Sequence, residues 1–391
     1  MNIEIIDNVF KKEDGIFDKD SAMKLSGIFA GVCYDEEGFN HKQKEAEEYT
    51  MKRVNRTLKN GHHSVYDHIT INLNIQNIPK ILAMFLNNEK EYTTSEKSLR
   101  YTSINQANEM ISIKEVELYN KWKEIFNNII KENYNEYFTN SKIENLSKEN
   151  ARYLTTVFIP TQMIYSTSFR QLNYLCGWME KYINESKTDF DKKVSIYMRE
   201  FIDKLKEKNL LDERLMVNDK NRSLSLITDK EPYEDYFSDV YKTSYKASFA
   251  QLAQAQRHRT LDYSASFLKD YEYFIPPILK SEPDLVNDWC NDMKEVESIY
   301  PQGQLVNINE RGYYENFILK CKERLCSAAQ LEVMLQTKDT LNKYKSFLQD
   351  NNDELYQDII KYSHGARCTF PDYNCPSDCK FLPGKTLTRK I

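Results

Sequence analysis

The chain has 391 residues, 40% of them hydrophobic and 29% charged, with a formal net charge of −5. This composition supports a large core, in one or two domains, and excludes a disordered or collagen-like chain. The small acidic excess argues against a general nucleic-acid-binding protein, so any recognition of phosphate must be local. The N-terminus does not resemble a signal peptide, no apolar run approaches the ~18 residues of a membrane span, and the cysteines are mostly scattered. We therefore expect a cytoplasmic protein without membrane contacts.

The expected elements begin with helices over 19–32 and 42–60, a half-buried strand over 69–75 and a helix over 77–88. Long amphipathic helices are predicted over 116–135 and 187–209. The polar segment 217–232 is the best linker candidate, and further helices are predicted over 244–256, 285–297 and 313–336. This helix-dominated mixture with a few strands favours the α+β class.

Two stretches of the chain share a spacing. Pro160 precedes Arg170 by ten residues, Pro301 precedes Arg311 by ten, and each pair leads into a helix-like stretch with aromatic residues. This internal similarity predicts two tandem, related halves, which we place at residues 1–216 and 233–391.

Three polar segments have the residue types of a ligand site. The segment 61–68, GHHSVYDH, holds three of the six histidines of the chain and either binds a cofactor or metal or forms a turn before the strand. The segment 87–103 clusters hydroxyls with Arg100, as a phosphate requires, although a solvated loop has the same composition. Arg257-His258-Arg259 can neutralise a phosphorylated ligand or form an exposed basic turn.

The C-terminal segment contains Cys368, Cys375 and Cys379 within twelve residues. Three thiolates at this density can bind zinc, with His364 or Cys326 as a fourth ligand. The spacing lacks the CxxC pair of a zinc knuckle, so a tail of reduced thiols is the alternative.

Together these segments resemble the flavin-dependent thymidylate synthases, with the family's motifs divided between the halves. The first half has His62-x-Ser64-x-x-Asp67-His68, similar to the family's HxSxxEH box, and Glu96-x-Ser98-x-Arg100-Tyr101, similar to the end of its Arg-His-Arg motif. Where the family has Arg-His-Arg, this half reads Asn88-Glu89-Lys90. The second half has Arg257-His258-Arg259, but Phe267 and Lys269 fill the later Ser and Arg positions.

The later family motifs are also present. Ser168-Phe169-Arg170 and Asn309-Glu310-Arg311 resemble its NxR segment, and Ala329-Gln330-Leu331-Glu332 resembles its AQxE helix. Because each half retains what the other has lost, the resemblance implies one active site shared by the two halves.

The resemblance implies an FAD-dependent methyltransferase that converts dUMP to dTMP, with methylenetetrahydrofolate and NADPH as co-substrates. It implies an α+β fold of two tandem domains, helix-rich with small sheets, and a homodimer that mimics the family's tetramer. The implied catalytic residues are Arg152, Arg257 and Arg324. The implied nucleotide-binding residues are Glu96, Ser98, Leu99, Arg100, Arg152, Gln254 and Arg257. The implied flavin-binding residues are His62, Ser64, Asp67, His258, Arg259, Asn309 and Arg311.

Two other hypotheses remain open. The protein could be a catalytically silent nucleotide-binding relative, or it could methylate or hydroxymethylate a related pyrimidine nucleotide. A zinc-tailed nucleic-acid-binding module is disfavoured by the net charge and by the lack of interleaved aromatic and basic residues.

Overall fold

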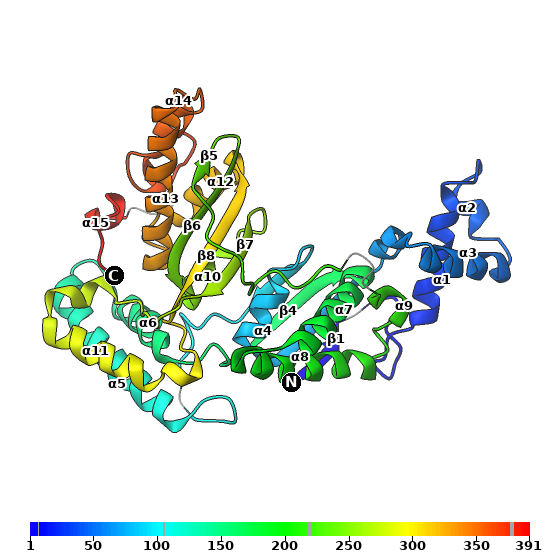
Figure 1. The fold of residues 1–391 in the computed structure, drawn as a ribbon, viewed down its shortest axis with the longest axis horizontal. Coiled ribbons are helices and arrows are strands. Elements are labelled where there is room, and N and C mark those ends of the chain that lie inside the picture. The colour runs from blue at the N-terminus through cyan, green and yellow to red at the C-terminus, as the bar shows by residue number, and fades with distance from the viewer. Residues whose placement is uncertain (7, 105, 218–220, 376–378) are drawn as a thin grey trace. The chain divides into compact units, whose positions relative to one another are not determined.

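The computed structural model describes residues 1–6, 8–104, 106–217, 221–375 and 379–391. The chain forms two compact units. Unit 1 comprises Met1–Lys97 and Pro160–Leu224, and unit 2 comprises Ser98–Ile159 and Ser225–Ile391. Figure 1 traces the elements of each unit. The units cut across the halves expected from sequence, because the segment 98–159 packs with the second half of the chain.

Unit 1 contains an antiparallel sheet with the strand order β1-β2-β4-β3. Its strands are β1 (Asn2–Ile5), β2 (Thr70–Pro79), β3 (Thr93–Glu96) and β4 (Pro160–Ser168). Ile71, Leu73 and Ile75 alternate with less buried residues and point into the core. The strand expected over 69–75 is therefore confirmed, and it continues to Pro79.

Several helices of unit 1 begin where a strand ends or at a capping residue. They are α1 (Lys19–Val32), α2 (Phe39–Lys42), α3 (Glu47–Lys59), α4 (Lys80–Leu86), α7 (Phe169–Glu185), α8 (Asp189–Glu207) and α9 (Glu213–Met216), with a 3₁₀ turn at His63–His68. Ser168 ends β4 and caps α7, because its side chain accepts a hydrogen bond from the backbone of Gln171. Helices α4 and α7 continue directly from β2 and β4 and pack on those strands (Figure 1).

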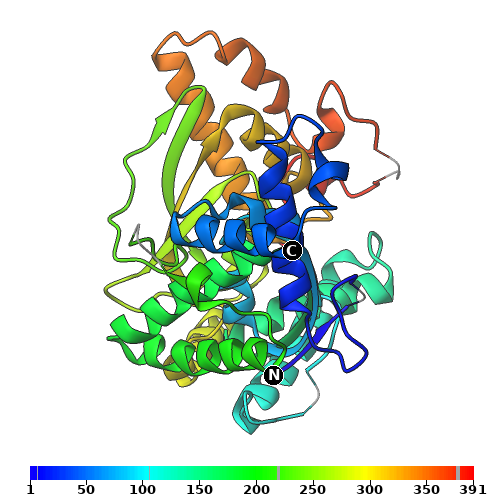
Figure 2. The same cartoon turned by 90° about the vertical axis from the view of Figure 1, so that its right-hand side faces the viewer.

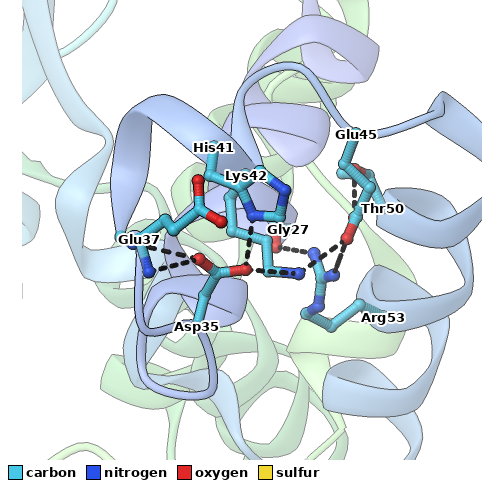
Figure 3. A network of polar contacts seen from close by, with 9 residues as sticks. Gly27, Asp35, Glu37, His41, Lys42, Glu45, Thr50 and Arg53 are labelled. Atoms are coloured by element: carbon cyan, nitrogen blue, oxygen red, sulfur yellow. Dashed lines mark hydrogen bonds and ion pairs between the residues drawn. The ribbon is translucent and has the colours of Figure 1, made fainter.

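Helices α1 and α3 pack closely, in the blue part of the chain (Figure 2). A Cβ atom on Gly27 would lie 2.6 Å from Cγ2 of Val54, so only glycine permits this approach. A polar network next to it holds the loop between the helices (Figure 3). Nη2 of Arg53 donates to both carboxylate oxygens of Glu45, at 2.7 and 2.8 Å. Nζ of Lys42 lies 3.0 Å from a carboxylate oxygen of Glu45 and 3.0 Å from one of Asp35.

Unit 2 contains a second antiparallel sheet, ordered β5-β6-β8-β7. Its strands are β5 (Tyr236–Phe237), β6 (Val240–Ser248), β7 (Asp262–Phe267) and β8 (Leu305–Tyr313). Its helices are α5 (Ile113–Tyr134), α6 (Asn140–Ala151), α10 (Phe249–Ala255), α11 (Pro283–Glu295), α12 (Tyr314–Arg324), α13 (Leu331–Asp350), α14 (Tyr356–Ile359) and α15 (Leu382–Lys385). Helices α10, α12 and α13 pack against this sheet.

The segment 98–159 is anchored in unit 2 by an aromatic core. The ring of Trp122, from α5, meets the ring of Trp289, from α11, edge-on at 4.8 Å. Asp292 accepts a hydrogen bond of 2.6 Å from Nε1 of Trp122. Ile143 and Leu146 of α6 belong to the same hydrophobic cluster. Residues far apart in the sequence thus form one core.

The two sheets have the same connectivity over the described residues. In each, a central strand leads directly into a seven-residue helix, α4 or α10, and the edge strand β3 or β7 begins seven residues after that helix ends. In this register Asn88-Glu89-Lys90 corresponds to Arg257-His258-Arg259, and Arg100 corresponds to Lys269. These are the pairings inferred from the motifs.

Several sequence predictions were wrong in detail. The Ala-rich segment 244–256 is half strand, because pairing of β6 with β8 outweighs helix propensity. The helix predicted over 313–336 is broken at residues 325–330. Arg170 lies in α7 whereas Arg311 lies in β8, so the ten-residue spacing from proline does not mark equivalent positions. Strands β4 and β8 were missed; in β8, Val306 to Glu310 are all buried, which hides the alternation of a strand.

Candidate functional site

The candidate site lies within unit 2 and centres on buried and half-buried arginines from both halves of the chain. Arg100 lies in the turn after β3, and Arg152 follows the last residue of α6. Arg324 ends α12, and Arg389 lies in the C-terminal segment. We call Arg100, Arg152, Arg324 and Arg389 the arginine cluster.

Several guanidinium nitrogens of this cluster are buried without a protein acceptor. Arg152 is only 4% exposed, and among the described residues its Nε and Nη2 have no hydrogen-bond partner. The same holds, within the described part of the chain, for Nε of Arg100 and Nε of Arg324. Buried donors without acceptors are costly, so these atoms are arranged to meet a ligand or ordered water.

The remaining donors of Arg100 and Arg324 have distant acceptors. Nη1 of Arg100 lies 3.5 Å from Oε2 of Glu149 and 3.4 Å from the carbonyl oxygen of Ala328. Nη2 of Arg324 lies 3.4 Å from the carbonyl oxygen of Gln254. These contacts are long for charged hydrogen bonds, so they orient the side chains without saturating them.

The positive charges of the arginine cluster repel one another. Burial lowers the pKa of Arg152, Arg324 and Arg389, and the positive charge of Arg100 lowers all three further. Burial also lowers the pKa of Lys142, where Arg389 and Arg100 again contribute and Glu149 opposes them. An anion bound among these cations would relieve their mutual repulsion. The arrangement therefore suits a phosphate or a similar oxyanion.

A buried network lies next to Arg152. The hydroxyl of Tyr153 donates to Oε2 of Glu332 at 3.0 Å and accepts from Nε2 of Gln330 at 2.7 Å. Glu332 also accepts hydrogen bonds from the backbone and side chain of Ser248, at the start of α10. The network thus ties the first-half residue Tyr153 to α10 and α13.

His258 is neutral in this environment. Burial, followed by the charges of Arg324 and Lys320, lowers its pKa to about 2. Its Nδ1 lies 3.6 Å from Glu323, which is too long for a strong ion pair, and its Nε2 has no partner among the described residues. His258 can therefore give a ligand a neutral ring nitrogen but not a positive charge.

The other expected residues of unit 2 differ in their burial and in their contacts. Ser98 accepts from the backbone of Arg100 at 3.3 Å, and Leu99 belongs to the hydrophobic core. Arg257 is half-buried next to the cluster, since its charge lowers the pKa of Arg324, whereas Arg259 is exposed. Gln254 contributes its carbonyl oxygen to Arg324.

Asn309 and Arg311 are already engaged. Oδ1 of Asn309 accepts from Ser244 at 2.5 Å, and its Nδ2 donates to the carbonyl of Glu231 at 3.1 Å. Arg311 is an exposed cross-strand partner of Asp262, at 3.3 Å. Both side chains already contact other protein groups, and their assignment to the flavin stays a prediction.

Unit 1 contains the remaining expected residues. His62 and Ser64 are exposed. Asp67 accepts from Ser168 at 2.6 Å and from Nε of Arg170 at 2.9 Å. The carboxylate of Glu96 lies 2.6 Å from Lys80 and 3.2 Å from Asn87, so protein groups already occupy it.

Sequence reasoning missed Lys142, Glu149 and Arg389. The sequence analysis assigned no role to any of these three residues. Glu149 contacts Arg100, 49 positions away, and Arg389 contacts Ala329, 60 positions away, so short-range periodicity does not mark them. A sequence feature that points to Arg389 is its place between the apolar residues Leu387 and Ile391, both of which are buried.

The described residues contain no group of three or more His, Cys, Asp or Glu side chains arranged to hold a single metal ion. Within the same residues, no helix is both long and apolar enough to cross a membrane. Cys368, Cys375 and Cys379 therefore do not form the expected ready-made zinc site.

Part of the chain is similar to a known protein family. Residues 17–181 match the family described as thymidylate synthase complementing protein. Two crystal structures of the flavin-dependent thymidylate synthase ThyX from Helicobacter pylori, each with FAD and dUMP, align at 14% identity and a TM-score of 0.32. Each alignment covers 55% of this chain and 99% of the other. No curated protein matches the chain. Over residues 17–181, the chain is therefore similar to the thymidylate synthase complementing proteins.

Proposed function

We propose that the chain is a flavin-dependent thymidylate synthase that methylates dUMP to dTMP. In this proposal the carbon comes from methylenetetrahydrofolate, and the electrons come from NADPH through FAD. The observation that carries the proposal is the arginine cluster. Arg100 and Arg152, from the first half, lie in the same compact unit as Arg324 and Arg389, and buried guanidinium nitrogens of this cluster lack protein acceptors.

The arginine cluster fits the phosphate of a nucleotide. A phosphate monoester offers three acceptor oxygens, and Arg100, Arg152 and Arg324 each have at least one donor without an acceptor among the described residues. Glu149 and the carbonyl of Ala328 hold Arg100 in place. Ser98, Leu99 and Gln254 shape the adjoining backbone in this proposal.

The pyrimidine ring would lie towards Arg257 and His258. A cation next to the ring stabilises the negative charge that develops on the base, and Arg257 is the half-buried cation of this segment. His258 stays neutral because of burial and its cationic neighbours, so it orients a ligand group without adding a charge.

The flavin would supply the redox chemistry, and the chain would position it. The exposed His62, Ser64 and Arg259 and the unpartnered nitrogen of His258, judged over the described residues, fit such a role. Asn309, Arg311, Asp67 and Glu96 fit less well, because protein groups already engage their side chains. In this proposal Asn309, Arg311 and Asp67 still contact the flavin, and Glu96 still contacts the nucleotide.

We also propose that the chain arose by tandem duplication and works as a homodimer in place of a family tetramer. The identical strand order of the two sheets and the equal spacing from α4 to β3 and from α10 to β7 support the duplication. The repeat boundaries remain those inferred from sequence, 1–216 and 233–391.

Nucleotide binding and flavin content test the proposal. The full-length protein should be yellow as purified, and calorimetry should show binding of dUMP. Arg152→Ala should weaken dUMP binding, whereas Lys269→Ala, at the exposed second-half counterpart of Arg100, should leave it unchanged. Conversion of dUMP to dTMP with NADPH and methylenetetrahydrofolate, followed by mass spectrometry, completes the test. Colourless protein that neither takes up FAD nor binds dUMP would refute the proposal.

A second candidate is a catalytically silent nucleotide-binding protein. The engagement of Asn309 and Arg311 by other protein groups favours it, since the expected flavin contacts are then fewer. This candidate predicts dUMP binding that depends on Arg152, without bound FAD or turnover. The same assay with dCMP reveals whether a related pyrimidine nucleotide is the acceptor.

A further inference from the structure

The turn between α12 and α13 packs against the C-terminal segment on both sides of one cysteine. Cys326 lies in this turn, and the thiol of Cys379 lies 3.6 Å from Oγ of its neighbour Ser327. On the other side of Cys326, the carbonyl of Leu325 accepts a hydrogen bond of 2.7 Å from the backbone of Arg367. Both chain neighbours of Cys326 thus contact the C-terminal segment.

The thiols of Cys326 and Cys379 share one small pocket. Both residues line a pocket of about 90 Å³, and both are half-buried, so small reagents reach them from solvent. Sγ of Cys326 accepts a hydrogen bond from the backbone of Ala328 at 3.5 Å, which keeps the sulfur beside the turn that Cys379 contacts. A disulfide needs the two Cβ atoms about 3.8 Å apart, so its formation requires both side chains to rotate towards each other.

The surroundings of this pocket are electropositive. Arg367 and Lys385 line it, and none of the described residues that line it is acidic. Burial lowers the pKa of Lys142 and of Arg389, and Cys326 is among the groups that oppose this shift, so both cations lie within electrostatic reach of its sulfur. The pocket therefore attracts a negatively charged reagent.

We propose that Cys326 and Cys379 are a redox-active thiol pair that reacts with a small anionic disulfide, such as oxidised glutathione. The thiolate of Cys326 attacks one sulfur of the reagent, the S–S bond of the reagent breaks, and one thiol leaves. Cys379 then attacks the mixed disulfide on Cys326 and displaces the second thiol. The protein loses two electrons, and the two released thiols take up these electrons and the two protons of the cysteines.

Cys379 is the partner in this proposal because its sulfur contacts Ser327 directly. Cys368, which also lines the pocket, approaches the turn through the backbone hydrogen bond of its neighbour Arg367. A reversible pair of this kind differs from a structural disulfide, and it is the usual type in compartments that keep thiols reduced.

The cross-link would restrain the turn that holds part of the arginine cluster. The carbonyl of Ala328 accepts from Arg100 at 3.4 Å, and the carbonyl of Ala329 accepts from Arg389 at 2.6 Å. A covalent bond between residues 326 and 379 would limit the movement of both carbonyls relative to the C-terminal segment, which carries Arg389. Oxidation should therefore slow local opening of this turn.

Mass spectrometry of the full-length protein tests the proposal. The protein is equilibrated in glutathione buffers of increasing oxidised fraction, and the remaining thiols are trapped with N-ethylmaleimide. A peptide pair joined through Cys326 and Cys379 should accumulate as the oxidised fraction rises and disappear after addition of dithiothreitol. Cys326→Ser and Cys379→Ser should each lose this pair, whereas Cys290→Ser, on α11 and outside the pocket, should retain it. A Cys326–Cys368 pair in its place, or no disulfide at any buffer ratio, would overturn the assignment.

Hydrogen exchange of the wild-type chain gives an answer even if a variant does not fold. The amide of Arg367, which donates to Leu325, should exchange more slowly in the oxidised protein than in the reduced protein. The amides of Glu37 and Gly38, in unit 1, are the internal control and should not change. Equal exchange at Arg367 in the two states would overturn the coupling of the disulfide to the turn. Neither readout depends on nucleotide or flavin, so the thiol pair and the proposed function fail or succeed separately.

Discussion

The hydroxyl of Tyr153 lies 3.0 Å from a carboxylate oxygen of Glu332, although 179 residues separate the two in the chain. The same carboxylate accepts two hydrogen bonds from Ser248, which begins α10. One buried acid therefore joins the segment 98–159 to two helices of the second half. This contact places Arg152, the neighbour of Tyr153, within the arginine cluster.

The environment of Glu332 predicts a pH dependence of stability. Burial is the main cause that raises its pKa above the ordinary value, so the folded unit binds this proton more readily than the unfolded chain does. The associated stability is present below the unfolded pKa of about 4.3 and is lost as pH rises through the folded pKa. In urea titrations, Glu332→Gln should therefore gain stability relative to wild type as pH rises across this window. A difference that does not change with pH would contradict this prediction.

The strands and helices differ in how well sequence predicts them. Helices α1, α5, α8 and α11 could be located to within a few residues, because amphipathic periodicity and caps are local signals. Strand β6 could not, because its pairing partner β8 is 57 or more residues away. The candidate site divides in the same way. Motifs identified Arg100, Arg152 and Arg324, but only contacts between distant segments bring Arg389 and Lys142 to them, such as the hydrogen bond from Arg389 to the carbonyl of Ala329.

Removing one partner of a buried ion pair should strongly destabilise unit 2. Nζ of Lys320 lies 2.6 Å from Oε2 of Glu310, and both side chains are fully buried. Tyr241 and Tyr245 each donate to the same carboxylate at 2.7 Å. Lys320→Ala leaves the buried charge of Glu310 without its cation, so it should cost about 3–5 kcal/mol.

Arg311→Ala is the matched control, because it breaks an exposed ion pair on the same strand as Glu310. Its expected cost is at most about 1 kcal/mol in the same chemical denaturation experiment. Equal costs for the two variants would show that leaving Glu310 without its buried cation carries no extra penalty.

Asp35 should determine the local order of the loop between α1 and α3. Hydrogen bonds from His41 and then Lys42 lower its pKa to about 2, so its carboxylate is charged at every pH above this value. Its Oδ1 also accepts from the backbone of Glu37 and Gly38, each at 3.0 Å (Figure 3). Asp35→Ala removes the acceptor and the charge together, and amide hydrogen exchange at Glu37 and Gly38 should accelerate.

Asp35→Asn separates the two contributions, since asparagine retains the acceptor oxygen but not the charge. Exchange at Glu37 and Gly38 should stay close to wild type in this variant. If Asn accelerates exchange as much as Ala does, the ion pairs with His41 and Lys42 order the loop instead of the backbone contacts.

Residues of both halves should contribute to nucleotide binding. If one nucleotide site uses residues of both, Arg100→Ala and Arg257→Ala should each weaken dUMP binding, although they belong to different halves. Loss of one charged hydrogen bond costs about 1.5–3 kcal/mol, which corresponds to a factor of about 10 to 150 in affinity. Lys90→Ala should change binding little, because Lys90 corresponds to Arg259 in the repeat and lies in unit 1, outside the arginine cluster.

FAD content should fall more in Arg259→Ala than in Arg100→Ala, since Arg100 contacts Glu149 and Ala328 at the phosphate end of the proposed site. Calorimetry with dUMP and the flavin absorbance of each variant measure both effects. If Lys90→Ala weakens dUMP binding as strongly as Arg257→Ala, the first half has a nucleotide site of its own and the shared site is wrong.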